Sequence, residues 1–251
     1  MTANPDLAGL VFLLVAAPFV GSFLGVVIDR LPHGRPVLWG RSRCASCGCS
    51  LAPRDLLPLL SWIAMRGRCR HCDAPIGGFS PAIELAALGV AVWAASQTSG
   101  ALLWVATGLG WALLVLAVID WRHFLLPDRL VLPLVPAGFA VAIWFNPAAL
   151  ADHLVGAIAG LAVLTAVAWA YRRLRGREGL GFGDAKLFAA AGAWVGWQGL
   201  PSVLLLGALL GLAGTLALHA GRHPLGTTTR ISFGSYLCLG LWLVWLYGPI
   251  A

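Results

Sequence analysis

Two pairs of cysteines with the same internal spacing are the clearest chemical feature of the sequence. Cys44 and Cys47 form one Cys-x-x-Cys pair, and Cys69 and Cys72 form a second. Two such pairs let four thiolates meet tetrahedrally on one ion, the pattern of a structural zinc site. The spacing leaves an iron–sulfur centre, or no metal, as alternatives. Because a closed four-thiolate site has no open coordination position, we expect its metal to be structural and not catalytic.

The other cysteines and a nearby histidine have simpler interpretations. Cys49 follows the first pair by two residues and is interpreted as a bystander, not a ligand. Cys238 lies in the last apolar run, where a small core residue is expected. His71, inside the second pair, is interpreted as an exposed polar residue.

Carboxylates at the ends of apolar runs are the second chemical feature, because such charges are costly near a membrane and mark functional positions. Asp120 closes one run in Val-Ile-Asp-Trp, and Asp184 opens another in Gly-Phe-Gly-Asp-Ala-Lys. Two carboxylates at matched depth fit an aspartyl-protease dyad, in which one acid stays protonated while the other activates water. Taken singly, Asp184 could be a helix N-cap and Asp120 a charge that snorkels to the interface.

Three further acids are assigned as follows. Asp128, in Leu-Pro-Asp, is predicted to be the N-cap of the apolar helix that follows it. Glu84 opens an apolar run and is either a partner of the helix dipole or part of a polar site. Asp29, next to Arg30, is interpreted as a solvated loop residue.

The composition shows what must position these groups. Of 251 residues, 59% are hydrophobic and only 11% are charged, with a mean hydropathy of +0.85, whereas a soluble domain carries roughly a quarter charged residues. An ordinary cytosolic enzyme, a disordered protein and a secreted disulfide scaffold are therefore excluded. Continuous apolar runs, without strict alternation, also exclude a porin-type barrel. We predict an all-α polytopic membrane protein.

The first apolar run is long enough to cross a membrane core of ~30 Å. With the runs that follow it we count eight predicted spans. The first is not a cleavable signal peptide, because Asp6 and no basic residue precedes it. The predicted spans are residues 7–28, 81–97, 101–119, 128–145, 152–170, 184–197, 201–219 and 232–247.

The net charge of +7 is an orientation signal. The connectors 98–100, 146–147 and 198–199 hold no Lys or Arg, and all 17 basic residues fall on the other side of the eight-span arrangement. By the positive-inside rule this side is cytoplasmic and both termini lie outside. The cysteine pairs are then in a reducing compartment, where disulfides are disfavoured. We expect a first helix over 1–28, a cytoplasmic zinc module over 29–80 and a seven-helix membrane core over 81–251.

Several stretches, in order along nearly the whole chain, resemble the signature elements of the type IV prepilin leader peptidases, bacterial polytopic aspartic proteases that also N-methylate their product. They are Gly21–Pro32, the two Cys-x-x-Cys pairs, Pro81–Leu85, Val118–Asp120 with Leu125–Asp128, Gly181–Leu187 and Phe233–Leu237. Two departures stand out: Gly25 replaces an expected asparagine, and Ser235 replaces the proline of a Phe-Gly-Pro-x-Leu element.

The resemblance implies roles for individual residues. Asp120 and Asp184 would be the catalytic pair, and Cys44, Cys47, Cys69 and Cys72 would bind zinc. Glu84, together with residues 21–30, would belong to the methyltransferase side, with S-adenosylmethionine as the methyl donor. The Gly25 departure falls in that N-terminal region, so methylation is a weaker expectation than cleavage.

The expected activity is removal of a short basic leader from prepilins or pseudopilins at the cytoplasmic face of the bacterial inner membrane. The alternatives are a broader Gly-x-Gly-Asp protease that cuts within a span, and a metal-handling or ion-translocating protein. The basic loop lacks interleaved aromatic residues, so anionic lipid headgroups are expected as its neighbours and nucleic acid is not.

Overall fold

The computed structural model describes residues 5–39, 42–176, 179–219 and 231–250, and within them the chain is entirely helical apart from loops and two isolated β-bridges. Six helices in this part are long and apolar enough to cross a membrane. This confirms the predicted all-α membrane class. The long helices are α1 (Pro5–Arg30), α3 (Phe79–Gln97), α4 (Gly100–His123), α5 (Asp128–Phe145), α6 (Leu150–Arg175) and α7 (Phe182–His219).

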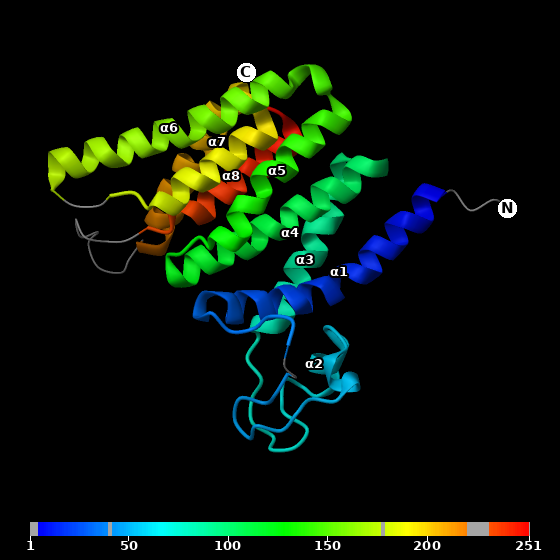
Figure 1. The fold of residues 1–251 in the computed structure, drawn as a ribbon. Coiled ribbons are helices and arrows are strands. Elements are labelled where there is room, and N and C mark those ends of the chain that lie inside the picture. Colours follow the sequence, from blue (N-terminus) through cyan, green and yellow to red (C-terminus); the bar gives the residue numbers. More distant parts are fainter. Residues whose placement is uncertain (1–4, 40–41, 177–178, 220–230, 251) are drawn as a thin grey trace. The chain divides into compact units, whose positions relative to one another are not determined.

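Shorter elements complete the chain (Figure 1). The apolar helix α8 (Phe233–Tyr247) has 15 residues, and α2 (Leu60–Ala64) lies in the polar segment that contains the cysteines. Single 3₁₀ turns occur at Leu31–His33, Pro53–Leu56 and Pro147–Ala149. The chain forms two compact units, residues 1–115 and 116–251, which we call the N-terminal and C-terminal units.

In the N-terminal unit, α1 packs against α3 at a point where only glycine fits. A Cβ atom on Gly21 would lie 2.7 Å from the Cα of Glu84 and 2.9 Å from the Cβ of Ala87. Trp111 of α4 donates its indole N–H to the Ala87 carbonyl at 3.0 Å. These apolar runs therefore form tightly packed helices, and Gly21 determines how closely α1 approaches α3.

Substitution at Gly21 is expected to destabilise the protein, whereas the same change at Gly25, one helical turn later, is not. Alanine at Gly21 must push α1 away from α3, which we expect to lower the free energy of unfolding by about 1–3 kcal/mol. A Cβ on Gly25 meets nothing within 4 Å, so Gly25→Ala should raise stability by up to ~1 kcal/mol through helix propensity. Thermal unfolding in detergent measures both, and equal effects would contradict this packing.

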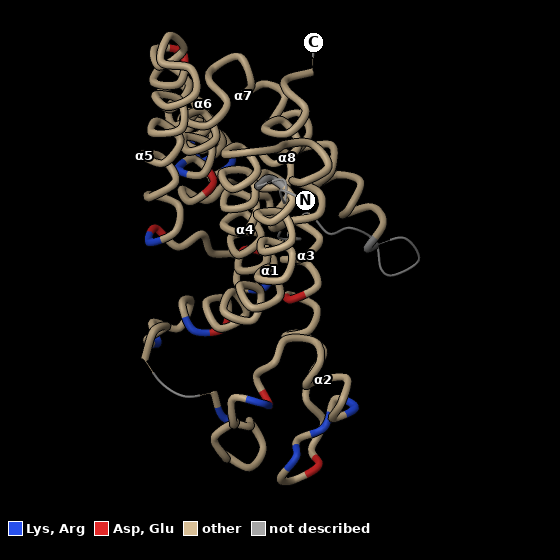
Figure 2. Tube along the Cα trace, turned by 90° about the vertical axis from the view of Figure 1, so that its right-hand side faces the viewer, with Lys and Arg blue, Asp and Glu red and all other residues tan. Residues whose placement is uncertain are grey.

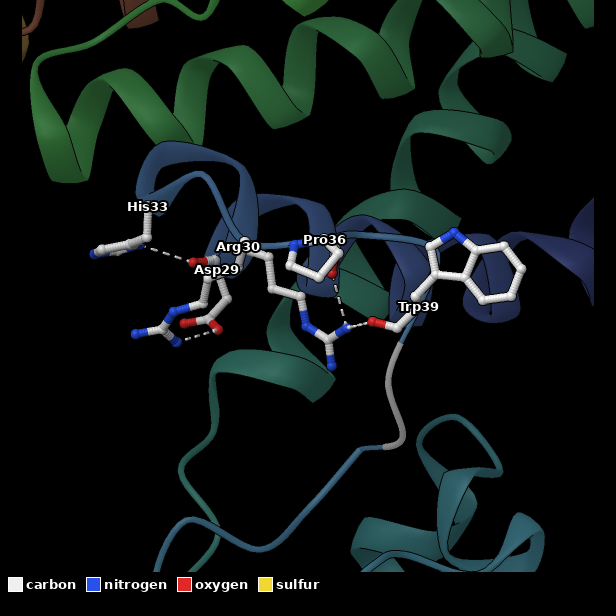
Figure 3. A network of polar contacts seen from close by, with 6 residues as sticks. Asp29, Arg30, His33, Pro36 and Trp39 are labelled. Carbon is white, nitrogen blue, oxygen red and sulfur yellow. Dashed lines mark hydrogen bonds and ion pairs between the residues drawn. The ribbon is translucent and has the colours of Figure 1, made fainter.

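Polar contacts gather where α1 ends (Figure 3). The guanidinium of Arg30 donates to the carbonyls of Pro36 and Trp39 at 3.2 and 3.3 Å, and the His33 ring lies 3.0 Å from the Asp29 carbonyl. Asp29 and Arg35 form an exposed ion pair at 4.0 Å, which agrees with a solvated Asp29. The predicted loop position is wrong, because Asp29 lies in the last turn of α1. Figure 2 shows charges at this end of α1 and in the segment that follows, whereas residues 7–28 carry none.

In the C-terminal unit, α6 packs along the first part of α7 through glycines. A Cβ on Gly160 would lie 2.5 Å from the Phe188 carbonyl oxygen, and one on Gly156 would lie 2.6 Å from that of Gly192. Trp194 donates its indole N–H to the Leu134 carbonyl of α5 at 2.8 Å. These small residues let helix backbones approach closely, as is usual between membrane helices.

Helix α7 reverses direction at Gly196, whose φ of 69° and ψ of 175° are not helical. Asp184 lies beside Gly234 at the start of α8, and Gly214, thirty residues later, lies against Tyr236 at the same end. At the other end of α8, the Ile250 amide donates to the Ser202 hydroxyl at 3.0 Å. The two arms of α7 are therefore antiparallel, as Figure 1 shows in yellow and orange.

The sixth and seventh predicted spans are thus these two arms, but the predicted break at 198–199 is wrong. Residues 198 and 199 are helical, and the turn lies at Gly196. A positive φ with an extended ψ is a region that only glycine adopts readily. Trp197 and Asp152 close the turn with a hydrogen bond of 3.1 Å.

Candidate active site and metal centre

The structure brings together the two acids singled out in the sequence. Asp120 lies in the last turn of α4 and Asp184 in the first turn of α7, with exposed fractions of only 5% and 9%. Gly234 of α8 lies between them, since a Cβ there would lie 3.0 Å from Asp120 Oδ2 and 3.0 Å from Asp184 Oδ1. These two oxygens are therefore separated by at most twice that distance, which is compatible with a carboxylate dyad.

Each carboxylate accepts a hydrogen bond from a helix start. The Ser235 amide donates to Asp120 Oδ2 at 2.8 Å, and the Ser235 hydroxyl lies 3.2 Å from the same oxygen. The Gly181 amide donates to Asp184 Oδ2 at 3.3 Å. Asp184 is the third residue of α7 and reaches back to the residue before the helix, so it is not the N-cap. Asp120 is buried, which argues against a charge that snorkels to solvent.

Leu126 covers the glycines beside this acid pair. Its side chain is 8% exposed, and its atoms lie 3.0 Å from the Cβ position of Gly183 and 2.8 Å from that of Gly234. Leu126 therefore packs where a side chain on either glycine would otherwise lie. Leu126 belongs to the Leu125–Asp128 motif, but its contact with these glycines was not predicted from the sequence.

Asp128 has a different role from the one predicted. Helix α5 begins at Asp128 itself, and the residue before it, Pro127, makes no side-chain cap. Both Asp128 carboxylate oxygens bind the Lys186 ammonium, at 2.7 and 2.8 Å, which lies 4.9 Å from the Phe182 ring centroid. The prediction of an N-cap is wrong, because the carboxylate joins α5 to α7 beside the acid pair.

The four paired cysteines also converge, in the N-terminal unit. The sulfur atoms of Cys44, Cys47, Cys69 and Cys72 all lie within 4.8 Å of one another, and those of Cys44 and Cys72 are 3.8 Å apart. A tetrahedral zinc site with Zn–S bonds of ~2.3 Å has sulfur–sulfur edges of about 3.8 Å. The four-cysteine cluster is therefore compatible with a tetrahedral metal site.

The two cysteine pairs sit on equivalent backbone loops. In the first, the Cys44 amide donates to the Cys49 carbonyl and the Gly48 amide to the Cys44 carbonyl, at 2.9 and 3.0 Å. In the second, the Cys69 amide donates to the Ala74 carbonyl and the Asp73 amide to the Cys69 carbonyl, both at 2.9 Å. Gly48 and Asp73 both have positive φ, at 71° and 56°. We call residues 42–76, which hold both loops, the cysteine module.

The thiols of the module differ in their pKa. Against the hydrogen bond from the Ala74 amide, burial and the neighbouring cysteine side chains raise the pKa of Cys72 to about 12, whereas that of Cys44 is lowered. Hydrogen bonds from the Cys47 and Ser46 amides lower the pKa of Cys44 to about 6, which prepares this sulfur to bind a metal. Nearby, Asp55 forms an ion pair with Arg70 at 2.9 Å. Burial opposes ionisation of Asp55, but the Arg70 and Ala52 donors outweigh it and hold the pKa below its usual value.

The remaining sequence interpretations agree with the structure. The sulfur of Cys49 is outside the four-cysteine group, and His71 is exposed. Cys238 is 2% exposed within α8. Arg41, Arg177, Arg222 and Arg230, which contributed to the predicted orientation, lie outside the described residues.

Glu84 links the cysteine module to α3. It is 5% exposed, and its Oε2 accepts the Leu59 amide at 2.7 Å while its Oε1 accepts the Ser80 hydroxyl at 3.1 Å. Leu59 has a φ of 60° and a ψ of −51°, which is a strained γ-turn for a residue with a side chain. Gly21 contacts the backbone of Glu84, so two of the motifs predicted for methyl transfer meet here. The strain at Leu59 had no signal in the sequence.

Two family models match the chain. The type IV leader peptidase family matches residues 107–216, which include both acids, and the bacterial peptidase A24 N-terminal domain matches residues 15–98, which include the cysteines and Glu84.

Curated relatives match almost the full length. A prepilin leader peptidase/N-methyltransferase of Burkholderia pseudomallei is 41% identical over 95% of this chain and 85% of its own length. Proteins of the same description from Stutzerimonas stutzeri and Pseudomonas aeruginosa are 37% and 36% identical, over 99% and 98% of this chain and 93% of their own lengths. No solved structure matches the chain.

Proposed function

Because the chain belongs to the type IV leader peptidase family, we propose that Asp120 and Asp184 hydrolyse the peptide bond between the leader and the mature part of a prepilin or pseudopilin. The chain is a bifunctional enzyme, prepilin leader peptidase and N-methyltransferase, of the aspartic type. The observation that carries the catalytic assignment is the convergence of two buried carboxylates on Gly234.

The proposed hydrolysis needs one proton shared between the two acids. The ionised carboxylate takes a proton from water, whose oxygen attacks the scissile carbonyl carbon, while the protonated carboxyl donates to the carbonyl oxygen. The resulting diol then collapses. The first acid passes its new proton to the leaving amine, and the second recovers its proton from the diol. The products are a leader carboxylic acid and a mature chain with a free amine, and both acids return to their starting states.

The burial of the site suits a substrate delivered through the membrane. The chain is a multi-pass membrane protein of a bacterial family. In the C-terminal unit, the ends of α4 and α6 and the starts of α5 and α7 carry Arg122, Arg129, Arg172, Arg173, Arg175 and Lys186. The acid pair lies at this basic edge, which supports a site at the cytoplasmic face of the inner membrane, beside anionic headgroups. A prepilin helix held among the membrane spans would bring its scissile peptide bond next to Asp120 and Asp184.

The cysteine module is proposed to bind structural zinc through Cys44, Cys47, Cys69 and Cys72. The module has few buried apolar side chains, since Pro58 and Cys69 are the buried ones among its described residues. Zinc held by four thiolates supplies the cross-link that a small apolar core cannot.

Glu84 is proposed to support methyl transfer, for which S-adenosylmethionine would supply the methyl group. Both Glu84 oxygens already accept hydrogen bonds from within the chain. This favours a positioning role, in which Glu84 holds the strained Leu59 turn of the cysteine module against α3, over direct contact with the methyl donor.

A single incubation tests the two proposed activities together. The purified protein in detergent is mixed with a prepilin and S-adenosylmethionine, and the products are read by intact mass. We expect loss of the leader and gain of one methyl group as separate mass changes. An intact prepilin after incubation with well-folded protein would contradict the proposed hydrolysis.

Substitution of Glu84 should separate methyl transfer from cleavage. Glu84→Ala removes both acceptors and is expected to lower the rate of methylation of a leaderless pilin by about a hundredfold. Each hydrogen bond to a carboxylate contributes ~1.5–3 kcal/mol, and without these bonds the Leu59 turn is no longer held against α3. Glu84→Gln keeps an acceptor for Leu59 and should lose less. Prepilin cleavage by the same preparations is the control. Methylation at the parental rate in Glu84→Ala would exclude this role.

A further inference from the structure

Ser235, at the start of α8, makes contacts that distinguish the two acids. We infer that Ser235 is a positioning residue that holds the negative charge on Asp120, so that Asp120 is the base of the reaction and Asp184 the acid. The inference rests on the proposed hydrolysis and deepens it, since a shared proton alone does not say which carboxylate begins the cycle ionised.

Both polar groups of Ser235 are aimed at one oxygen of Asp120. The backbone amide donates to Oδ2 at 2.8 Å, and the hydroxyl oxygen lies 3.2 Å from the same atom. Donors of this kind stabilise a charged carboxylate more than a neutral one. Because both contacts fall on Oδ2, the proton that Asp120 takes from water goes to its other oxygen, Oδ1.

The Ser235 hydroxyl has a hydrogen-bond acceptor in each protonation state of Asp120. Its oxygen also lies 2.8 Å from the Ala117 carbonyl oxygen, and a hydroxyl has one proton to donate and lone pairs to accept. When Asp120 is ionised, the hydroxyl can turn toward Oδ2. When Asp120 has taken the proton of water, the hydroxyl can donate to Ala117. Ser235 therefore remains hydrogen-bonded in both states of the base.

The contact described for Asp184 is weaker. Its Oδ2 accepts the Gly181 amide at 3.3 Å, near the limit for a hydrogen bond. One long hydrogen bond stabilises a charge less than the short amide contact and the hydroxyl of Asp120. When two close carboxylates share one proton, it resides on the one whose charge is less stabilised. Asp184 is therefore the acid that donates to the scissile carbonyl.

The start of α8 explains why this amide is available. Ser235 is the third residue of the helix, and the first amides of a helix have no partner within it. Gly234 has no Cβ, which lets the carboxylates approach this turn. The Phe-Gly-Pro-x-Leu element that this segment resembles would place a proline at this position, and proline has no N–H. Ser235 supplies an amide and a hydroxyl there instead.

Three substitutions at Ser235 test the inference through the kinetics of prepilin cleavage. Ser235→Ala keeps the amide and should lower kcat about tenfold with an unchanged KM, because one hydrogen bond to a charged group is lost. Ser235→Pro is compatible with the first turn of a helix, removes both donors and should lower kcat by roughly a further tenfold. Ser235→Thr restores the hydroxyl and should recover parental kcat.

A matched control and a second activity keep the test independent of folding. Ser202→Ala also removes a buried hydroxyl, one that accepts the Ile250 amide at the other end of the unit, and should cleave at the parental rate. Methylation of a leaderless pilin should be unchanged in all four variants. Parental kcat in both Ser235→Ala and Ser235→Pro, or a loss in Ser235→Ala that threonine does not recover, would overturn the inference. If Asp120→Asn and Asp184→Asn still cleave, the proposed hydrolysis itself fails.

Discussion

Asparagine in place of either Asp120 or Asp184 is expected to lower the rate of prepilin cleavage at least about a thousandfold, as removal of one member of a catalytic unit does elsewhere. Asparagine has almost the same shape, so the packing around Gly234 should survive. It can neither take a proton from water nor donate one to the scissile carbonyl as a carboxyl group does. The rate is measured as conversion of prepilin to leaderless pilin in detergent.

Asp152→Asn is the matched control for this experiment. Asp152 lies in the first turn of α6, at the Gly196 turn, and accepts the Trp197 indole N–H at 3.1 Å. Asparagine keeps an acceptor there, so parental cleavage is expected. Cleavage by either Asp120→Asn or Asp184→Asn at a rate close to that of Asp152→Asn would end the assignment of the dyad.

Loss of one zinc ligand is expected to have the second largest effect. Cys69 is 4% exposed and belongs to the four-sulfur group, so Cys69→Ser should abolish stoichiometric zinc binding and unfold the cysteine module. Structural zinc contributes apparent binding free energies of about 10–16 kcal/mol, most of which is folding free energy in such small modules. Metal content of the purified protein and limited proteolysis within residues 42–76 measure the two effects.

Cys49→Ser provides the matched comparison. Its sulfur is exposed and outside the four-cysteine group, so this variant should keep one zinc per chain and the parental proteolysis pattern. Chelation of the parent protein should reproduce the pattern of Cys69→Ser. Equal zinc content in Cys49→Ser and Cys69→Ser would contradict the site, and iron in place of zinc in the parent would favour the iron–sulfur alternative.

The sequence predicted the parts of this protein that depend on hydropathy and on strong motif spacing. Long apolar runs can satisfy their backbone groups in a membrane only as helices, so most helix bounds were close to those observed. The Cys-x-x-Cys pairs fix their ligands through local loops, and the four sulfur atoms do converge. The juxtaposition of Asp120 and Asp184 was also predicted, from their matched depth at one membrane face.

Features that depend on tertiary contact were not predictable from residue patterns. The turn of α7 lies at Gly196 because glycine is needed for its backbone angles, whereas the interruption of the apolar run at Gln198 and Gly199 suggested a later break. Asp128 follows a proline and looked like a cap, but Lys186, distant in sequence, binds it instead. Ser235 was noticed as a departure from a motif, and only its position beside Asp120 shows what the change provides.

The most direct test of the account is one measurement on Asp184→Asn. The variant is incubated with S-adenosylmethionine and an equal mixture of prepilin and leaderless pilin, and both substrates are read by intact mass. We expect the leaderless pilin to gain one methyl group while the prepilin keeps its leader. Removal of the leader by this variant at the parental rate would contradict the claim that the buried acid pair carries out the hydrolysis.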